Sequence, residues 1–435
     1  MSKCEPAKEE CKPSQDRIGL LRDLSKALME VFTRKKTLFD EMMEKYLRDQ
    51  VENLYKTTFS VPTFQKWQAC YAVQEYLKEN AKTLRTVSFN CEAEKLSPPS
   101  YQEVEVKRNV HQPLLVFGWK FYKWKGIPVV SVSDYKGRTS ETTFYVNKKN
   151  KHAVSDLISA IRFYMKDHNY FRGEKLKVVD GCLFEFLEYP KLSFDEIVLD
   201  PVFKEELTLN LLFPIKNEAL CKEFSIPWRR GVLIGGEPGT GKTKLSKVLC
   251  NVLDCTVLWV STESIGQAWE MKQVFEGARL LSPTLIIFED VDFLGTDREI
   301  DRNPILGELL NQLDGNSPNY GIFVLASTNR PNLLDRALAN RPGRFDLKLE
   351  LTKPDLEARK KLIKLFIIGK TLDPSLNLER LAEDTQGLTG SHIQEVITYG
   401  MLDALHLNSR VLRNENLSKG LSSVKGRGKK NELSS

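Results

Sequence analysis

The segment GEPGTGKT, residues 236–243, constrains the fold of this chain more than any other feature. It follows the apolar run GVLIGG and precedes KLSKVL, so a strand, a glycine-rich turn and a helix succeed one another. Glycines let backbone N–H groups converge on phosphate oxygens, and the helix N-terminus adds its positive end. The segment therefore predicts a phosphate-binding loop in an α/β domain. The predicted nucleotide contacts are Gly236, Glu237, Pro238, Gly239, Thr240, Gly241, Lys242, Thr243 and Lys244.

Two residues of this loop have distinct expected roles. Lys242 would reach the β- and γ-phosphates of a nucleotide, and Thr243 would supply a hydroxyl to Mg²⁺. The alternative is an ordinary glycine-rich turn between a strand and a helix. The complete spacing of the motif argues against that alternative, because each position has a separate job in holding phosphate.

A second apolar run, TLIIFED, ends in the acid pair Glu289 and Asp290. Chains that split nucleotides usually write such a pair as Asp then Glu, so the order here is reversed. Two carboxylates at the end of a buried strand can serve a metal ion and the attacking water. We predict that Glu289 lies on the Mg²⁺ side, that Asp290 is the base, and that hydrolysis is slow but real.

A third motif, STNRPNLLDRALANRPGRFD, follows another apolar strand. Asn329 ends that strand and is placed to hold the lytic water or to touch the γ-phosphate. Arg341 and Arg344 flank Pro342-Gly343, on a segment that cannot continue a helix. An arginine aimed at a nucleotide from a neighbouring subunit stabilises the transferring phosphate, so both are candidate catalytic residues.

In this order and spacing, residues 194–405 resemble the AAA family of ATPases, within the AAA+ class. FSIPWRRGVLIGGEPGTGKT and the Glu-Asp order are most similar to the branch containing the mitochondrial translocase of the Rieske iron–sulfur protein and its soluble prokaryotic relatives. The resemblance implies ATP and Mg²⁺ as cofactors and a homo-oligomeric ring, most often a hexamer, with heptamers known in that branch. It also implies that Arg341 and Arg344 act in trans, and that the ring works on a protein client.

Two positions depart from the family pattern. In GLTGSHIQEV the family usually has Asp where this chain has His392, so we interpret His392 as a packing or surface residue rather than a lid sensor. In VSTESIGQAWEMKQVF only Ile265-Gly266 could stand for the loop with which relatives grip a threaded chain. We interpret the nearby Trp269 as a buried anchor.

The local pattern of apolar residues changes along the chain and divides it into regions. Helical spacing dominates the start, where a stripe over residues 21–42 suits an amphipathic helix or a coiled-coil seam. Short aromatic and β-branched runs follow, then alternating strands and helices, then helices alone. We expect an N-terminal helical region (1–85), a β-rich middle domain (86–192), an α/β P-loop AAA+ core with a parallel sheet and flanking helices (193–352), a C-terminal helical lid (353–410) and a basic, disordered tail (411–435).

Composition narrows the function without naming it. Lys plus Arg number 64 and Asp plus Glu 58, so the net charge of +6 is too small to indicate a nucleic-acid surface. Eight cysteines show no CxxC pairing, which fits reduced thiols. The polar N-terminus and the absence of a long apolar run predict a cytoplasmic protein without a membrane span.

Two classes of function remain at this point. The leading hypothesis is a chaperone-like ATPase ring that remodels or moves protein clients selected by residues 1–190. The alternative is a nucleic-acid-linked AAA+ motor or loader that uses the basic tail and the strand FYKWKG. An antiparallel strand with one face exposed to water is the simpler interpretation of FYKWKG. An ATP-switched scaffold with slow turnover is a third interpretation.

Overall fold

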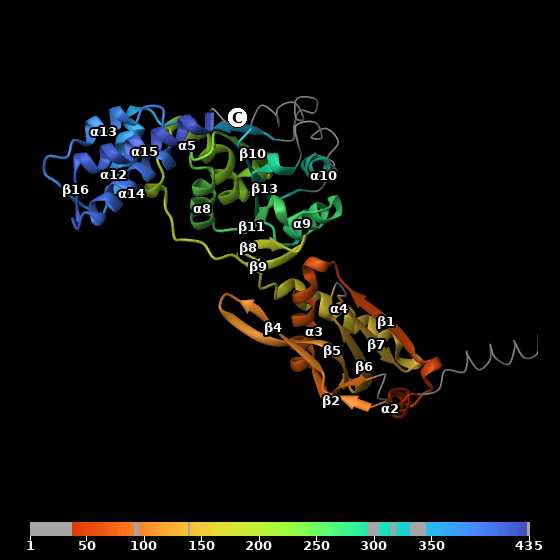
Figure 1. Ribbon diagram of the computed structural model, residues 1–435. Helices are drawn as coiled ribbons and strands as arrows, with labels where there is room; N and C mark the ends of the chain where they lie inside the picture. Colours follow the sequence, from red (N-terminus) through yellow and green to blue (C-terminus); the bar gives the residue numbers. More distant parts are fainter. Residues whose placement is uncertain are drawn as a thin grey trace, which may run out of the picture.

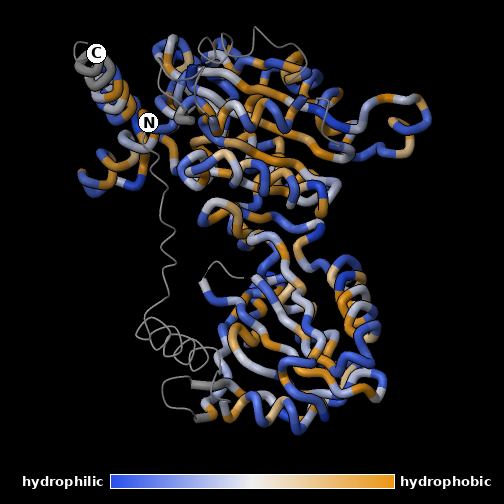
Figure 2. Tube along the Cα trace, turned by 90° about the vertical axis from the view of Figure 1, so that its right-hand side faces the viewer, coloured by the Kyte–Doolittle hydropathy of each residue, from blue (hydrophilic) through white to orange (hydrophobic). Residues whose placement is uncertain are grey.

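The computed structural model describes residues 37–90, 95–137, 140–294, 304–314, 319–330 and 345–432. An N-terminal domain lies at one end of the molecule, an α/β core in the middle, and a group of helices beside the core (Figure 1). No helix within the described ranges is both long and apolar enough to cross a membrane. Orange, hydrophobic stretches concentrate along the strands of both parts (Figure 2).

The N-terminal domain is an antiparallel sheet with helices on both faces. Its strands run in the order β1-β7-β6-β5-β2-β3, and β4 also pairs with β5. Helices α3 and α4 pack on one face of the sheet, and α2 packs on the other. The elements are α2 (Leu38–Leu47), β1 (Tyr55–Ser60), α3 (Lys66–Asn80), β2 (Ala81–Asn90), β3 (Lys95–Ser97), β4 (Ser100–Lys107), β5 (Val110–Trp124), β6 (Ile127–Asp134), β7 (Glu141–Val146) and α4 (Lys151–Asp167).

The strands of this domain bury alternate residues, as expected where successive side chains point to opposite faces. In β7 the buried residues are Thr142, Phe144 and Val146. The aromatic run in β5 is also part of the interior, because Phe121 and Tyr122 are almost fully buried. Packing therefore accounts for FYKWKG, and the structure gives no support to a nucleic-acid surface on that strand.

The core is a sheet in the order β14-β10-β13-β12-β11-β8-β9, in which all neighbours are parallel except the β8–β9 hairpin. The central strands are buried on both faces, and every residue of β13 is buried. This is the burial expected of a parallel sheet covered by helices, and it confirms the predicted α/β core. The strands are β8 (Lys175–Val179), β9 (Leu183–Phe186), β10 (Arg230–Gly235), β11 (Thr256–Ser261), β12 (Thr284–Glu289), β13 (Ile322–Thr328) and β14 (Leu347–Glu350).

The helices of the core lie between these strands along the chain. They are α5 (Pro201–Leu207), α6 (Phe213–Lys216), α7 (Glu218–Glu223), α8 (Lys242–Val252), α9 (Ala268–Leu280) and α10 (Pro304–Leu313). Between α5 and α6 the chain forms a π-helical segment, Thr208–Leu212.

Two predicted boundaries are wrong. Residues 55–60 lie in the region predicted to be helical, yet as β1 they pair with β7 of the N-terminal sheet. Residues 175–186 were assigned to the β-rich domain, yet β8 pairs with β11 and so extends the sheet of the core. Both errors have one cause: sheet membership depends on pairing between distant segments, which local periodicity does not record.

The C-terminal helices form the predicted lid, but the lid is longer than expected. Its elements are α12 (Leu356–Ile367), β15 (Thr371–Leu372), α13 (Leu378–Asp384), α14 (Gly390–His406), β16 (Val411–Leu412) and α15 (Asn414–Glu432). The prediction of a disordered tail from residue 411 is wrong, because α15 packs against α14 and buries Leu417 and Val424. Leu417 and Val424 are seven residues apart and so lie on the same face of the helix, which packs on α14. The otherwise polar composition of the segment led to the wrong prediction.

The N-terminal domain and the core share one apolar contact region. Phe64 precedes α3 in a short 3-10 turn (Thr63–Gln65), is 5% exposed, and belongs to the cluster that fills one side of the core. Its ring lies 5.8 Å from that of Phe184 in β9. A Cβ atom at Gly277 in α9 would clash with the Phe184 ring at 2.5 Å and would lie 3.2 Å from the Phe64 ring, so this glycine permits the close approach.

Trp269 at the start of α9 does not behave as predicted. Its side chain is 42% exposed, so it is not a buried anchor, whereas the neighbouring Ile265 is 4% exposed. The apolar face of α9 is occupied instead by Met271, Val274 and Phe275. Trp269 precedes that face in the first turn of the helix, where fewer neighbours surround it.

Candidate active site

The glycine-rich loop joins β10 to α8, as predicted. Gly236 and Gly239 have φ values of 153° and 81°, a region that favours glycine. A Cβ atom on Gly236 would lie 2.5 Å from the backbone oxygen of Leu351, and one on Gly239 would lie 2.8 Å from the Thr389 hydroxyl. The glycines therefore allow both the turn and the close approach of two other segments.

Lys242, in the first turn of α8, is buried beneath this loop. Its ammonium group donates hydrogen bonds to the carbonyl oxygens of Gly236 (2.7 Å) and Glu237 (3.0 Å). Burial lowers the pKa of Lys242, while Asp290 and Asp292 act in the opposite direction. The loop thus holds a positive charge at the point where phosphate oxygens would enter.

Asp290 directly follows β12 and faces the same space. Its backbone is left-handed, with φ 49°, a conformation that Asp tolerates better than most residues. The side-chain amide of Asn329 donates a 2.9 Å hydrogen bond to the Asp290 carboxylate. Burial and the Asp292 charge raise the pKa of Asp290, against the effects of Lys242 and Asn329. The structure thus brings together the base and the water-holding residue predicted from the sequence.

Glu289 points elsewhere. One carboxylate oxygen, Oε2, accepts a 3.2 Å hydrogen bond from the indole N–H of Trp259 on the adjacent strand β11. Trp259 pairs with Ile287, and Ser261 with Glu289, so Trp259 and Glu289 share one face of the sheet. The second oxygen, Oε1, is buried without a hydrogen-bond partner. Sequence reasoning missed Trp259, although the register of two adjacent strands ending together was the available signal.

The donor set fits a magnesium ion. Mg²⁺ takes oxygen ligands, often one or two carboxylates with waters and phosphate oxygens. Thr243 is exposed toward the nucleotide space, and the unpartnered Oε1 of Glu289 is an orphaned buried acceptor that a hydrated cation would satisfy. Thr243 lines the nucleotide cavity and Glu289 does not, so the assignment of Glu289 to the metal stays a prediction.

A cavity of about 940 Å³ lies between the core and the lid. Residues 238–244 of the loop line it together with Asp290 and Asn329. Gly236 and Glu237 do not line it and instead bind Lys242 through their carbonyl groups. Such a volume between two parts of a protein is typical of a cofactor or substrate pocket. The cavity unites the predicted nucleotide contacts with the predicted base.

The lid touches the phosphate loop directly. The backbone N–H and the hydroxyl of Ser391, in the first turn of α14, donate to the Gly239 carbonyl oxygen at 3.1 and 3.3 Å. A second connection is the 2.9 Å ion pair between Lys353 and Glu237. His392 forms a capping box with Thr389 and so stabilises the start of α14. This packing role agrees with the interpretation of His392 drawn from the sequence.

Arg341 and Arg344 lie outside the residues that the structure describes, so their predicted action in trans stays a prediction.

Comparison with known proteins agrees with this geometry. Residues 232–353 match the model of the "ATPase family associated with various cellular activities (AAA)". Residues 232–353 are therefore similar to the AAA family of ATPases. The match covers the strand before the phosphate loop, both acidic residues, Asn329 and the segment with the two arginines.

Relatives of the AAA domain occur in proteins of several kinds. The chain is 35% identical over 223 residues to cell division control protein 48 homolog B of Arabidopsis thaliana, which covers 48% of this chain and 37% of the relative. It is 30% identical over 262 residues to the proteasome-activating nucleotidase of Sulfurisphaera tokodaii. That match covers 57% of this chain and 66% of the relative. It is 32% identical over 225 residues to the ATP-dependent zinc metalloprotease FtsH 3 of Petrotoga mobilis. That match covers 49% of this chain and 35% of the relative. The chain thus spans about a third to two thirds of these relatives.

Proposed function

We propose that this protein is an ATP-hydrolysing ring that couples nucleotide turnover to the remodelling or movement of protein clients. The observation that carries the proposal is the single cavity in which the phosphate loop, the Asp290–Asn329 pair and the lid helix α14 meet. Relatives named as a proteasome-activating nucleotidase and as an ATP-dependent protease support protein as the class of client.

The chemistry follows from the charges in the cavity. Lys242 can exchange its carbonyl partners for phosphate oxygens of ATP, which offsets their negative charge. Asp290, oriented by the Asn329 amide, is placed to accept a proton from the attacking water. Thr243 and Glu289 would hold Mg²⁺, which supplies charge neutralisation of the phosphates when bound.

The lid contact suggests how turnover becomes movement. Ser391 of the lid donates a hydrogen bond to the carbonyl oxygen of Gly239, in the loop that would hold phosphate. Loss of the γ-phosphate on hydrolysis would therefore alter a loop that directly contacts the lid. Rotation of the lid against the core would then move the attached domains. In a ring, Arg341 and Arg344 would complete the site of the next subunit.

Three finer predictions belong to this proposal. The ring is expected to be a hexamer, with a heptamer as the alternative. The Glu289–Asp290 order and the segment FSIPWRRG favour the branch containing the Rieske-protein translocase. A cytoplasmic location remains the expectation, to be checked by fractionation. Native mass spectrometry with ATP measures the subunit number directly.

The main test measures ATP turnover alone and with three additions: reduced, alkylated lysozyme as a permanently unfolded protein, double-stranded DNA, and RNA. We expect stimulation by the unfolded protein alone and loss of turnover in Lys242→Ala. Stimulation by nucleic acid that declines steeply with salt would overturn the choice of client. Absence of turnover in the wild-type ring would overturn the proposal itself.

The action of the arginines in trans has a separate test. Subunits carrying Arg341→Ala are mixed with subunits carrying Lys242→Ala, which are each expected to be inactive. A mixed ring contains sites with an intact loop facing an intact arginine, so turnover should return. No recovery at any mixing ratio would count against arginines that act in trans.

A further inference from the structure

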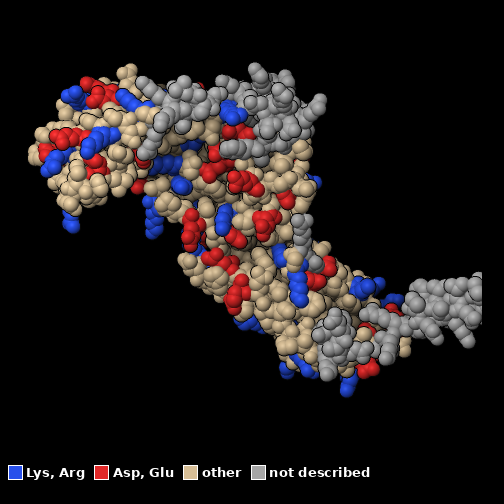
Figure 3. Space-filling view, in the orientation of Figure 1, with Lys and Arg blue, Asp and Glu red and all other residues tan. Residues whose placement is uncertain are grey.

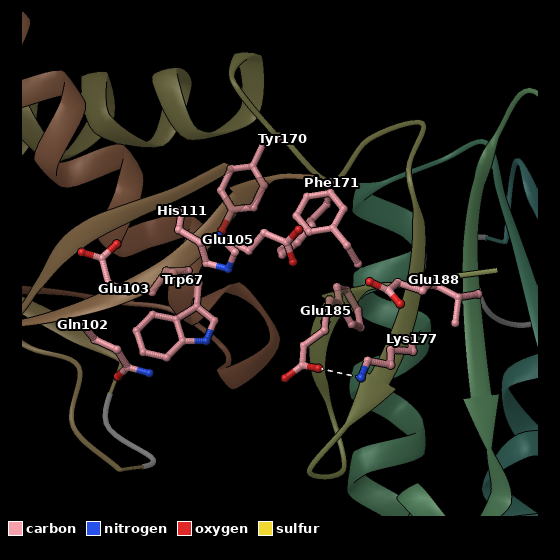
Figure 4. A pocket seen from close by; sticks show the side chains of 14 residues that line it. Trp67, Gln102, Glu103, Glu105, His111, Tyr170, Phe171, Lys177, Glu185 and Glu188 are labelled. Carbon is pink, nitrogen blue, oxygen red and sulfur yellow. Dashed lines mark ion pairs between the residues drawn. The ribbon is translucent and has the colours of Figure 1, made fainter. Parts of the chain in front are cut away.

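A second cavity lies where the N-terminal domain meets the core, away from the nucleotide site. Its volume is about 510 Å³, within the range of ligand pockets. Figure 4 shows its side chains facing one another across the space between the two parts. Trp67, Tyr170, Phe171 and Lys177 line it, together with four glutamates.

Two sheet edges form opposite walls of this cavity. On one side is β4, which pairs with β5 and has no second partner strand among the described residues. On the other side is β9, the last strand of the core sheet, which pairs only with β8 within the same described part of the chain. The two strands lie near each other without pairing. Unpaired edges present backbone donors and acceptors that an extended peptide can use.

The floor of the cavity is aromatic. Tyr170 packs against the apolar clusters of both the N-terminal domain and the core. Its hydroxyl is buried without a hydrogen-bond partner. Burial raises the pKa of Tyr170, so the hydroxyl stays protonated and can donate. A buried donor without a partner costs free energy that a ligand carbonyl group would recover.

The rim of the cavity is acidic. Four glutamates line it (Glu103, Glu105, Glu185 and Glu188), against the single charged amine of Lys177. Lys177 forms a 2.9 Å ion pair with Glu185, and the backbone N–H of Asn109 donates to Glu105. Among the described contacts, Glu103 and Glu188 have no ion pair. On the face shown in Figure 3, acidic side chains gather on the core toward the N-terminal domain. This charge selects cations and repels nucleic acid and phosphate.

We propose that this cavity binds an extended segment of a protein client that contains both lysine or arginine and apolar residues. The identification of the segment as part of a client rests on the proposed function. Each side of the cavity offers one aromatic ring and one glutamate, Trp67 and Glu103 from the N-terminal domain and Phe171 and Glu188 from the core. A segment that contains both cations and apolar residues could therefore meet both kinds of group. Phe64 connects this region to α9 of the AAA domain, which places the bound segment beside an element of the ATPase core.

The test measures binding without nucleotide, so that it does not depend on ATP turnover. Fluorescence anisotropy follows a fluorescein-labelled decapeptide of alternating valine and lysine, added to the full chain. The control peptide has glutamate in place of lysine. The variants are Glu103→Gln with Glu188→Gln, Tyr170→Phe, and Glu52→Gln as an exposed carboxylate of the same domain outside the cavity.

We expect the lysine peptide to bind and the glutamate peptide not to bind. The double glutamine variant should weaken binding by about tenfold or more, because hydrogen bonds to charged groups contribute more than neutral ones. Tyr170→Phe should weaken it by about threefold, and Glu52→Gln should leave it unchanged. Unchanged melting temperatures show that these variants remain folded.

Absence of lysine-peptide binding at about 100 µM, a concentration that detects weak peptide recognition, would overturn this site. Equal binding of the two peptides would also overturn it, and so would equal affinity of the wild type and the double glutamine variant for the lysine peptide. ATP turnover of the same variants without peptide is measured separately. Peptide binding without turnover would reject the proposed ATPase and keep the site, whereas turnover without peptide binding would reject the site alone.

Discussion

The two sheets of this protein bury their strands differently. In the core, β12 and β13 are buried on both faces, so the residues at their ends are held by packing from above and below. In the N-terminal domain, β7 buries every second residue, and β4 has an open edge as far as the described residues go. A sheet enclosed on both faces suits chemistry, which needs fixed positions, and a sheet with a free edge suits recognition. If so, substitutions in the core should change ATP turnover, and substitutions at the open edge should change peptide binding.

The largest effect is expected in the acid pair at the end of β12. Asp290→Asn keeps the shape of the side chain but removes the base, so turnover should fall by about 10²–10⁴-fold. ATP binding, measured with a fluorescent analogue, should persist. Glu289→Gln should mainly raise the Mg²⁺ concentration needed for half-maximal turnover. If Asp290→Asn hydrolyses normally while Glu289→Gln is inactive but binds ATP, the two roles are reversed.

The connection between the regions is tested at Phe64. Phe64→Ala leaves a cavity between Phe184 and Gly277, and such truncations cost about 3–5 kcal/mol. Calorimetry should show the N-terminal domain melting apart from the core and at a lower temperature. Phe163→Ala is the matched control, because Phe163 lies in the same domain and is 73% exposed. Equal melting curves for the two variants would show that Phe64 does not join the regions.

A smaller effect is expected at Trp259, within the core alone. Trp259→Phe keeps an aromatic ring but removes the hydrogen bond to Glu289, a contact that contributes about 0.5–1.5 kcal/mol. The Mg²⁺ requirement should rise by about two- to tenfold, with peptide binding unchanged. Trp228→Phe is the control, because its indole donates to Pro214 away from the acid pair. An identical Mg²⁺ requirement in the two variants would show that the Trp259–Glu289 hydrogen bond does not affect metal binding.

The smallest effect concerns the pH dependence of turnover. The Asn329 amide favours the charged form of Asp290 and so opposes the rise of its pKa. In Asn329→Ala the pKa should rise further, so the acidic limb of the pH–rate profile should move to higher pH. Ser327→Ala is the control, since the Ser327 hydroxyl accepts from the backbone N–H of Asp290 and does not bind the carboxylate. A limb that stays in place would show that Asn329 does not tune the base.

The sequence predicted the parts of this structure that local spacing encodes. The phosphate loop follows from adjacent residues, and the Asp290–Asn329 contact follows because parallel strands end at one edge of the sheet. Membership of β1 and β8 in their sheets depends on partners far along the chain, and the predicted boundaries failed there. The orientation of Glu289 toward Trp259 also required the register between strands. The cavity between the regions arises only from their docking, which no local pattern records.

The left-handed backbone at Asp290 bears on the order of the two acids. Asp and Asn are the non-glycine residues that adopt positive φ most readily, because their short side chains can bond to nearby backbone groups. Exchanging the pair would place a longer glutamate at φ 49°, where a strained residue costs on the order of 1–3 kcal/mol. The order Glu289–Asp290 is therefore matched to the turn that follows β12.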